Sequence, residues 1–155
     1  MAGNIQGSFF SLLAGSVFAV LLGSTTVAQA DELAAQQQIR DVISRTYDKP
    51  EHKVETAPVI VVDGYAIADW VQGERGGRAL MHLIDGNWTI MACGADAFKQ
   101  PATLIESGIP EQTAQALAKQ LHDSEQSLSP EKRKQFSLLG TKDDPAMADH
   151  HHHHH

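Results

Sequence analysis

The pattern of apolar and polar positions changes its period along the chain and divides it into a helix, a set of strands and a second set of helices. Between Glu32 and Tyr47 the apolar positions return at helical spacing, with polar side chains between them, which predicts an amphipathic helix. Lys49-Pro50 ends this helix, because the residue before a proline avoids helical backbone. The folded part of the chain is therefore expected to begin with one helix.

Two pairs of apolar runs rich in valine, isoleucine and aromatic residues follow. Each pair is joined by Asp-Gly, the strongest short signal for a two-residue hairpin turn, because both central residues of that turn take positive φ. The predicted strands are 58–62, 65–72, 78–84 and 87–93, and the segment 73–77 connects the two hairpins. The pattern predicts a four-stranded antiparallel meander.

The last third of the chain returns to helical spacing. Pro101 and Pro110 stand at expected first turns of helices, Gly108 stands at a C-terminal cap, and Ser129-Pro130 begins a further helix. The whole pattern predicts an α+β fold, with an N-terminal helix packed on the four-stranded antiparallel meander and short C-terminal helices after it. Cystatin-like and NTF2-like folds share this architecture, an analogy that carries no function.

The N-terminal thirty residues read as an export signal. They hold no Lys, Arg, Asp or Glu and contain the apolar run FFSLLAGSVFAVLLG. Small residues at Ala28 and Ala30 match the pattern that signal peptidase accepts, so residues 1–30 are predicted to be a cleavable signal peptide and the protein to be periplasmic. The run is shorter than the ~20 residues that span a bilayer, which predicts no stable membrane insertion after cleavage. The alternative is a buried N-terminal helix or a retained anchor.

The C-terminal segments set the limits of the domain, and the net charge excludes some classes of partner. Residues 150–155 are consecutive histidines and are interpreted as a purification tag, and residues 141–149 are polar and predicted to be disordered. Residues 31–140 are then one α+β domain, long enough for a modest core. The net charge of −7 argues against nucleic acid and anionic membrane surfaces as partners, because both favour basic patches.

Cysteine and motif content narrow the chemistry further. Cys93 is the only cysteine, so the chain forms no internal disulfide. The sequence holds no H-E-x-x-H, C-x-x-C, G-x-S-x-G or phosphate-binding loop motif. The protein is therefore expected not to be an enzyme; the alternative is an NTF2-like enzyme that uses a buried pair such as Asp69 with His82.

The predicted register of the second hairpin places soft metal ligands on one face. The pairs expected on this face are Ile84–Asn87, His82–Thr89, Leu80–Met91 and Arg78–Cys93. Thiolate, thioether and imidazole are the ligand types that favour Cu(I), so Cys93, Met91 and His82 are the candidate metal ligands. The alternative is a structural role, since a lone cysteine is among the most buried residue types and helices would cover this face.

The glycine-rich segment 73–78 and a nearby acid give two further candidates. Successive glycines with Arg75 and Arg78 are typical of a loop that cradles an anion through backbone N–H groups, and a flexible hairpin connection explains the glycines as well. Asp69 lies in an otherwise apolar strand, which predicts an ion pair with one of these arginines ahead of a catalytic role.

The central blocks of the sequence then allow a comparison with a family. The blocks are GYAIADW from Gly64, GGRAL from Gly76, DGNW from Asp85 and CGAD from Cys93. In this order they resemble, over about residues 58–128, a family of bacterial periplasmic proteins labelled copper uptake system-associated. That family tends to read C-S-G-D in the last block, so its small polar residue is absent here. The resemblance implies a link to copper acquisition, and it points to Cys93, Asp96 and the corner Gly76-Gly77-Arg78 without giving them roles.

Two hypotheses of function stay open at this point. The first is a non-enzymatic periplasmic accessory protein in copper handling, which binds Cu(I) or a partner such as a periplasmic copper chaperone or copper transporter. The second is a periplasmic module that binds a protein or a small molecule in a cavity between helix and sheet, with no metal role. A pocket lined by Trp70, Trp88 and Tyr65 would favour the second.

Overall fold

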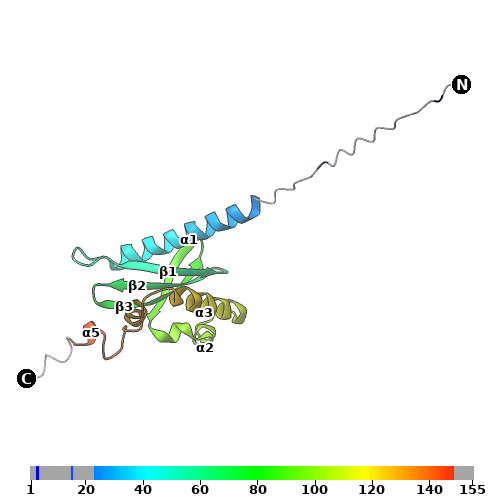
Figure 1. The fold of residues 1–155 in the computed structure, drawn as a ribbon. Helices are drawn as coiled ribbons and strands as arrows, with labels where there is room; N and C mark the ends of the chain where they lie inside the picture. Colours follow the sequence, from blue (N-terminus) through cyan, green and yellow to red (C-terminus); the bar gives the residue numbers. More distant parts are fainter. Residues whose placement is uncertain (1–2, 4–14, 16–22, 149–155) are drawn as a thin grey trace, which may run out of the picture.

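A computed structural model of the chain describes residues 3, 15 and 23–148, and these contain a long helix, a sheet and a group of short helices in chain order (Figure 1). The long helix, α1, spans Gly23–Tyr47. The strands are β1 Glu55–Val62, β2 Tyr65–Gln72, β3 Arg75–Ile84 and β4 Asn87–Gly94. They pair antiparallel in the order β1-β2-β3-β4, so the predicted meander and the α+β fold are confirmed.

Short helices follow the sheet; those that begin at Pro101, Glu111 and Pro130 match the predicted starts to within one residue, and the other two were not predicted. The short helices are the 3-10 turn η1 (Asp96–Lys99), α2 (Pro101–Glu106), α3 (Glu111–Gln126), α4 (Pro130–Phe136) and α5 (Pro145–Ala148). Gly108 has a φ of 96°, the left-handed backbone that favours glycine after a helix. Ser129 caps α4, since its Oγ accepts a hydrogen bond from the backbone N–H of Lys132 at 3.2 Å. Among the described helices, none combines the length and the apolar character needed to cross a membrane.

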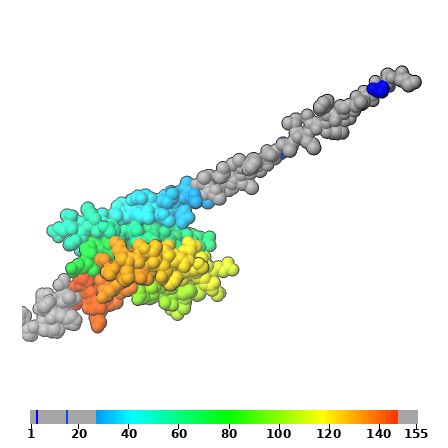
Figure 2. Space-filling view, viewed as in Figure 1, coloured from blue at the N-terminus to red at the C-terminus, as the bar shows by residue number. Residues whose placement is uncertain are grey.

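Helices cover both faces of the sheet (Figures 1 and 2). On one face, Ile39 and Ile43 of α1 are buried in a cluster with Met81 of the sheet. On the other face, Leu117 of α3 is buried with Leu80 of the same strand. Successive residues of β3 therefore contribute to opposite cores, as the two-residue period of a strand requires.

Both Asp-Gly turns have the predicted conformation. Asp63 and Asp85 each have a φ of 49°, and the glycines that follow them each have a φ of 78°. Positive φ at both central residues defines the hairpin turn whose twist matches that of the flanking strands. These turns are the local reason that the runs on either side of them form hairpins.

Residues 73–77 were predicted to be the loop that connects the two hairpins, and the structure differs from this prediction. β3 already begins at Arg75, and Gly76 and Gly77 pair with β2 as strand residues. A Cβ atom on Gly76 would overlap the carbonyl oxygen of Gln135, because α4 lies directly over this part of β3. The segment is therefore a covered strand with a two-residue turn before it, and neither a flexible connection nor an anion-binding loop.

The two ends of the chain also bear on the predictions. The predicted signal peptide is residues 1–30, and most of it lies outside the described residues; its last residues are part of α1. Residue 149 and the predicted tag, 150–155, also lie outside the described residues. Residues 141–148 differ from the predicted disorder, because they contain α5 and are tied to β3. Asp144 is 3% exposed and accepts a hydrogen bond from Arg75, a partner 69 residues away that no local pattern could indicate.

Candidate functional site

A β-bulge in β4 changes which side chains meet on each face of the sheet. The two predicted pairs nearest the Asp85 turn are confirmed. Beyond them the register shifts by one residue at Met91, so Cys93 lies opposite Ala79 and not opposite Arg78. A shift of one residue moves a side chain to the other face of a strand. The predicted pairs of Met91 with Leu80 and of Cys93 with Arg78 are therefore wrong, and Cys93 lies on the α1 face.

The three candidate metal ligands consequently lie apart. The His82 ring stacks on Tyr65 with the ring centroids 4.2 Å apart, and Tyr65 packs against the core under α3. Cys93 lies beside the end of α1, where its Sγ is 3.9 Å from the hydroxyl of Tyr47. Over residues 23–148 no three His, Cys, Asp or Glu side chains are placed to share one metal ion. The structure thus separates His82 from Cys93.

Cys93 and Met91 nevertheless share one surface feature. Both line a shallow groove between the last turns of α1 and β4, which also includes Tyr47 and Trp88. Met91 is 41% exposed, and the free Cys93 is exposed as well. Burial by its neighbours still raises the pKa of the Cys93 thiol, and the contact with Tyr47 offsets this only in part. The groove therefore presents a thiol and a thioether to solvent.

Arg78 is the centre of a buried ion cluster between the sheet and the C-terminal helices. Its side chain is 1% exposed. Its Nε donates to Glu125 Oε1 at 2.9 Å, and its Nη1 donates to Asp96 Oδ1 at 3.1 Å. Asp69 Oδ1 lies 3.5 Å from Arg78 Nε. Arg78 is therefore the arginine that lies beside Asp69, as predicted, but the raised pKa of Asp69 makes its partner a neutral carboxyl group and not the predicted ion.

Asp69 is the uncharged member of this cluster at neutral pH. Both of its carboxyl oxygens are buried and have no hydrogen-bond partner among the described residues. Burial and, to a smaller extent, the neighbouring Glu125 raise the pKa of Asp69 to about 9, although Arg78 acts to lower it. Lys99 Nζ lies 3.9 Å from Glu125 Oε2. With Asp69 neutral, the carboxylates of Glu125 and Asp96 balance the two cations, so the buried charges are compensated.

Phe136 and Ser137, at the end of α4, pack against this cluster. Arg78 Nη1 donates to the carbonyl oxygen of Phe136 at 3.3 Å, and its guanidinium lies 5.9 Å from the centre of the Phe136 ring. Burial acts to raise the pKa of Asp96, but the hydroxyl of Ser137 and the guanidinium of Arg78 outweigh it and lower that pKa. Arg78 and Asp96, two of the residues to which the family resemblance points, therefore have structural partners.

The glycines of the same blocks also have packing explanations. A Cβ atom on Gly77 would lie 2.9 Å from the carbonyl oxygen of Gly94 and 3.0 Å from Cβ of Leu139. A Cβ atom on Gly94 would lie 2.9 Å from the ring of Phe98. Real Cβ atoms avoid such contacts, so neighbouring elements approach the backbone at these positions because no side chain is present.

Arg75, the second arginine of the predicted anion cradle, is held by the C-terminal segment. Its Nε donates to Asp144 Oδ1 at 3.1 Å and its Nη2 donates to Asp144 Oδ2 at 3.4 Å. Burial acts to raise the pKa of Asp144, but these bonds and the backbone N–H groups of Gly140 and Ala146 outweigh it and lower that pKa. The charge of Arg75 is therefore matched within the chain.

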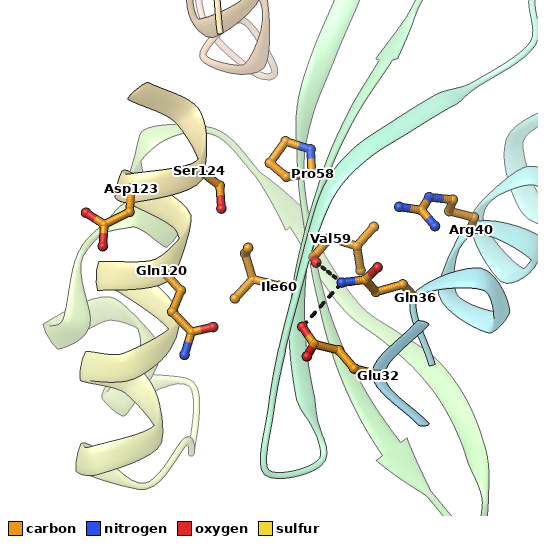
Figure 3. Close-up of a pocket in the computed structure, with 9 residues that line it drawn as sticks. All are labelled: Glu32, Gln36, Arg40, Pro58, Val59, Ile60, Gln120, Asp123 and Ser124. Atoms are coloured by element: carbon orange, nitrogen blue, oxygen red, sulfur yellow. Dashed lines mark hydrogen bonds between the residues drawn. The ribbon is translucent and has the colours of Figure 1, made fainter. Parts of the chain in front are cut away.

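A polar pocket lies at the outer edge of β1, between α1 and α3 (Figure 3). Gln36 Nε2 donates to the carbonyl oxygen of Val59 at 3.2 Å, and Arg40 Nε donates to that of Thr56 at 3.1 Å. Because an edge strand exposes unpaired carbonyl groups, these two side chains of α1 cap the edge of β1. The polar side chains of α1 in this pocket therefore serve to cover the backbone carbonyl groups at the edge of β1.

Sequence reasoning missed Glu125, Asp144 and Tyr47 as partners of the candidate residues. A signal existed for Glu125, which follows Leu117 and Leu121 at four-residue spacing and so falls on the apolar face of α3. A carboxylate on that face predicts a buried cationic partner. No protein-family model, curated protein or solved structure matches the chain.

Proposed function

We propose that the protein is a non-enzymatic, exported accessory protein of copper handling, which binds Cu(I) or a copper-carrying partner at the groove between α1 and β4. The observation that supports this proposal best is that Cys93 and Met91 line the groove together and are both exposed. A thiolate and a thioether are ligands that favour Cu(I). His82 is left out of the proposed ligand set, because it stacks on Tyr65 away from Cys93.

The other residues of the copper-family resemblance support this choice by elimination. Gly76 and Gly77 allow close packing of the C-terminal segment, and Arg78 and Asp96 pair with each other in the ion cluster. Cys93 is the residue of these blocks that combines a reactive side chain with exposure to solvent. A chemical role in these blocks is therefore best given to Cys93.

A site with two sulfur ligands suits an accessory protein better than a storage protein. Two ligands leave coordination positions on the metal for sulfur or imidazole groups of a partner. The partner would be a periplasmic copper chaperone or copper transporter that meets the exposed edge of β4. Such a shared site allows the metal to pass between the two proteins without release into water.

Export is also part of the proposal. Val27 and Leu33 are 62% and 64% exposed, and core packing in α1 involves residues from Ala35 onward. Cleavage after Ala30 would therefore leave every core residue that the structure describes in the domain. Mass spectrometry of the protein recovered from a periplasmic fraction should give Asp31 as the N-terminal residue, and an intact Met1 would contradict export by cleavage.

The copper site is tested by competition for Cu(I) against a chromophoric chelator. The protein should begin at Asp31 and lack the histidines 150–155, which bind metal by themselves. Wild type is expected to take up one equivalent of Cu(I). Cys93→Ser should weaken binding by about a hundredfold, and Met91→Leu by about tenfold, since losses on this order follow the removal of groups around a metal.

His82→Ala is the matched control, because it removes the third predicted ligand from the other face of the sheet. We expect it to bind Cu(I) as wild type does. Equal and negligible uptake by wild type and Cys93→Ser would contradict direct binding and leave the partner as the copper carrier. A loss in His82→Ala equal to that in Cys93→Ser would contradict the two-sulfur site.

A further inference from the structure

Next to the groove, and sharing Cys93 with it, lies a cavity of about 130 Å³. The residues that line it come from the end of α1, the loop before β1, the sheet and the segment after α4, and they include Tyr47, Val54, Trp70, Arg75, Cys93 and Leu139. An engineered cavity of about 150 Å³ in another protein holds one benzene molecule. We propose that this cavity is a binding site for a small, neutral, mostly apolar molecule that carries one hydrogen-bond acceptor.

The need for an acceptor comes from Trp70. This residue is 9% exposed, and its indole N–H is buried without a hydrogen-bond partner among residues 23–148. Buried indole N–H groups usually find a partner, and an unpaired one is costly. Because Trp70 lines the cavity, an acceptor atom on a bound molecule would satisfy its N–H group.

The neutral character of the ligand follows from the other polar groups at the cavity. The side-chain amide of Gln72 already donates to the carbonyl oxygens of Tyr47 at 2.7 Å and His52 at 3.0 Å. Arg75 is matched by Asp144 through two hydrogen bonds. A ligand carboxylate would therefore enter as an unmatched buried charge, which is strongly unfavourable.

The apolar character follows from the walls. Val54 is 9% exposed and belongs to the core cluster under α1, and Leu139 packs against the same cluster. The cavity also shares Tyr47 and Cys93 with the outer groove. A bound molecule would thus lie against Cys93 and restrict access to its thiol, and the inference does not depend on copper binding.

The first test follows the indole signal of Trp70 by NMR. The chain has two tryptophans, so Trp88→Phe leaves a single ¹⁵N–¹H indole resonance, that of Trp70. The probes are cyclohexanone, with one carbonyl acceptor, methylenecyclohexane, with the same shape and no acceptor, and cyclohexanecarboxylate. Cyclohexanone should give a saturable downfield shift, and the other two should bind at least about tenfold more weakly, as expected where a site's buried donor is left unpaired.

The second test uses the wild-type protein, because Trp88 is a core residue and its replacement can weaken the fold. Cys93 is the single cysteine, so its alkylation by iodoacetamide reports on this position alone. Cyclohexanone should slow the alkylation severalfold, with the same half-saturating concentration as the indole shift. Leu139→Phe, which fills the cavity, should abolish this protection.

Three results would overturn the inference. One is the absence of both a saturable indole shift and protection of Cys93 in the wild-type protein. Another is equal binding of methylenecyclohexane and cyclohexanone, because it would mean an apolar hole with no recognition of an acceptor. The third is tighter binding of cyclohexanecarboxylate, which would assign the site to anions.

Discussion

The guanidinium of Arg78 in β3 donates to the carboxylate of Glu125 in α3 at 2.9 Å, across 47 residues of sequence. Both side chains are almost fully buried, so this bond joins the sheet to the C-terminal helices inside the protein. Buried ion pairs are weak evidence for net stability, but the loss of one partner leaves the other charged and unpaired. The integrity of the C-terminal half should therefore depend on Arg78.

We predict that Arg78→Met destabilises the protein by about 3–5 kcal/mol, because it leaves Glu125 as an unpaired buried carboxylate. Urea unfolding followed by circular dichroism measures the change in the free energy of unfolding. Lys119→Met is the control, since it breaks the exposed pair with Asp123 on the same helix as Glu125. The control should unfold as wild type does, and an equally small effect of Arg78→Met would contradict a structural role for the cluster.

Asp69 makes stability depend on pH. Its pKa is raised from 3.8 to about 9, so the folded state favours the protonated carboxyl. The stability that Asp69 contributes is therefore fully present below about pH 4 and is lost as the pH rises through 9.

We predict that Asp69→Asn reduces the fall in stability between pH 5 and pH 8.5, because the amide does not titrate. Thermal unfolding at several pH values in this range would measure the difference. Asp123→Asn is the matched control, since that carboxylate is exposed and its pKa is lowered by the bond from Lys119, so it does not titrate in this range. A slope in Asp69→Asn equal to that of wild type would mean that Asp69 is ionised in the folded protein.

Gly76 provides a test of how closely α4 packs on β3. Gly76→Ala places a methyl group against the carbonyl oxygen of Gln135, and such overpacking costs about 1–3 kcal/mol. Hydrogen exchange followed by mass spectrometry should show faster exchange of the amides in α4. Gly86→Ala strains the β3–β4 turn, where a Cβ meets nothing within 4 Å, and it should leave exchange in α4 unchanged.

The capped edge of β1 leads to a prediction about self-association. Gln36→Ala together with Arg40→Ala exposes the carbonyl groups of Val59 and Thr56 at the edge of the sheet. Exposed edges pair with other chains, so we expect the apparent mass in light scattering to rise with protein concentration. Gln37→Ala serves as the control, because the side chain of Gln37 bonds only to Asp41 among the described residues. Its apparent mass should be the same as that of wild type at every concentration.

The sequence by itself determined the features that depend on a few neighbouring residues. The turns at Asp63 and Asp85 were predictable because Asp-Gly takes the positive φ values that the hairpin requires. The end of α2 at Gly108 and the cap of α4 at Ser129 follow from equally local preferences. Together with the apolar runs between the turns, these signals were enough for the order and type of the four strands and of α1 to α4.

Only the tertiary structure decided which side chains meet. The bulge at Met91 places Cys93 beside Tyr47, and the pairs of Arg78 with Glu125 and of Arg75 with Asp144 join segments far apart in sequence. A bulge shifts by one residue every pair beyond it, so an ideal register becomes wrong for the residues farthest from the turn. Ion pairs of this kind depend on where distant helices pack, and no preference of a residue for its own backbone conformation carries that information.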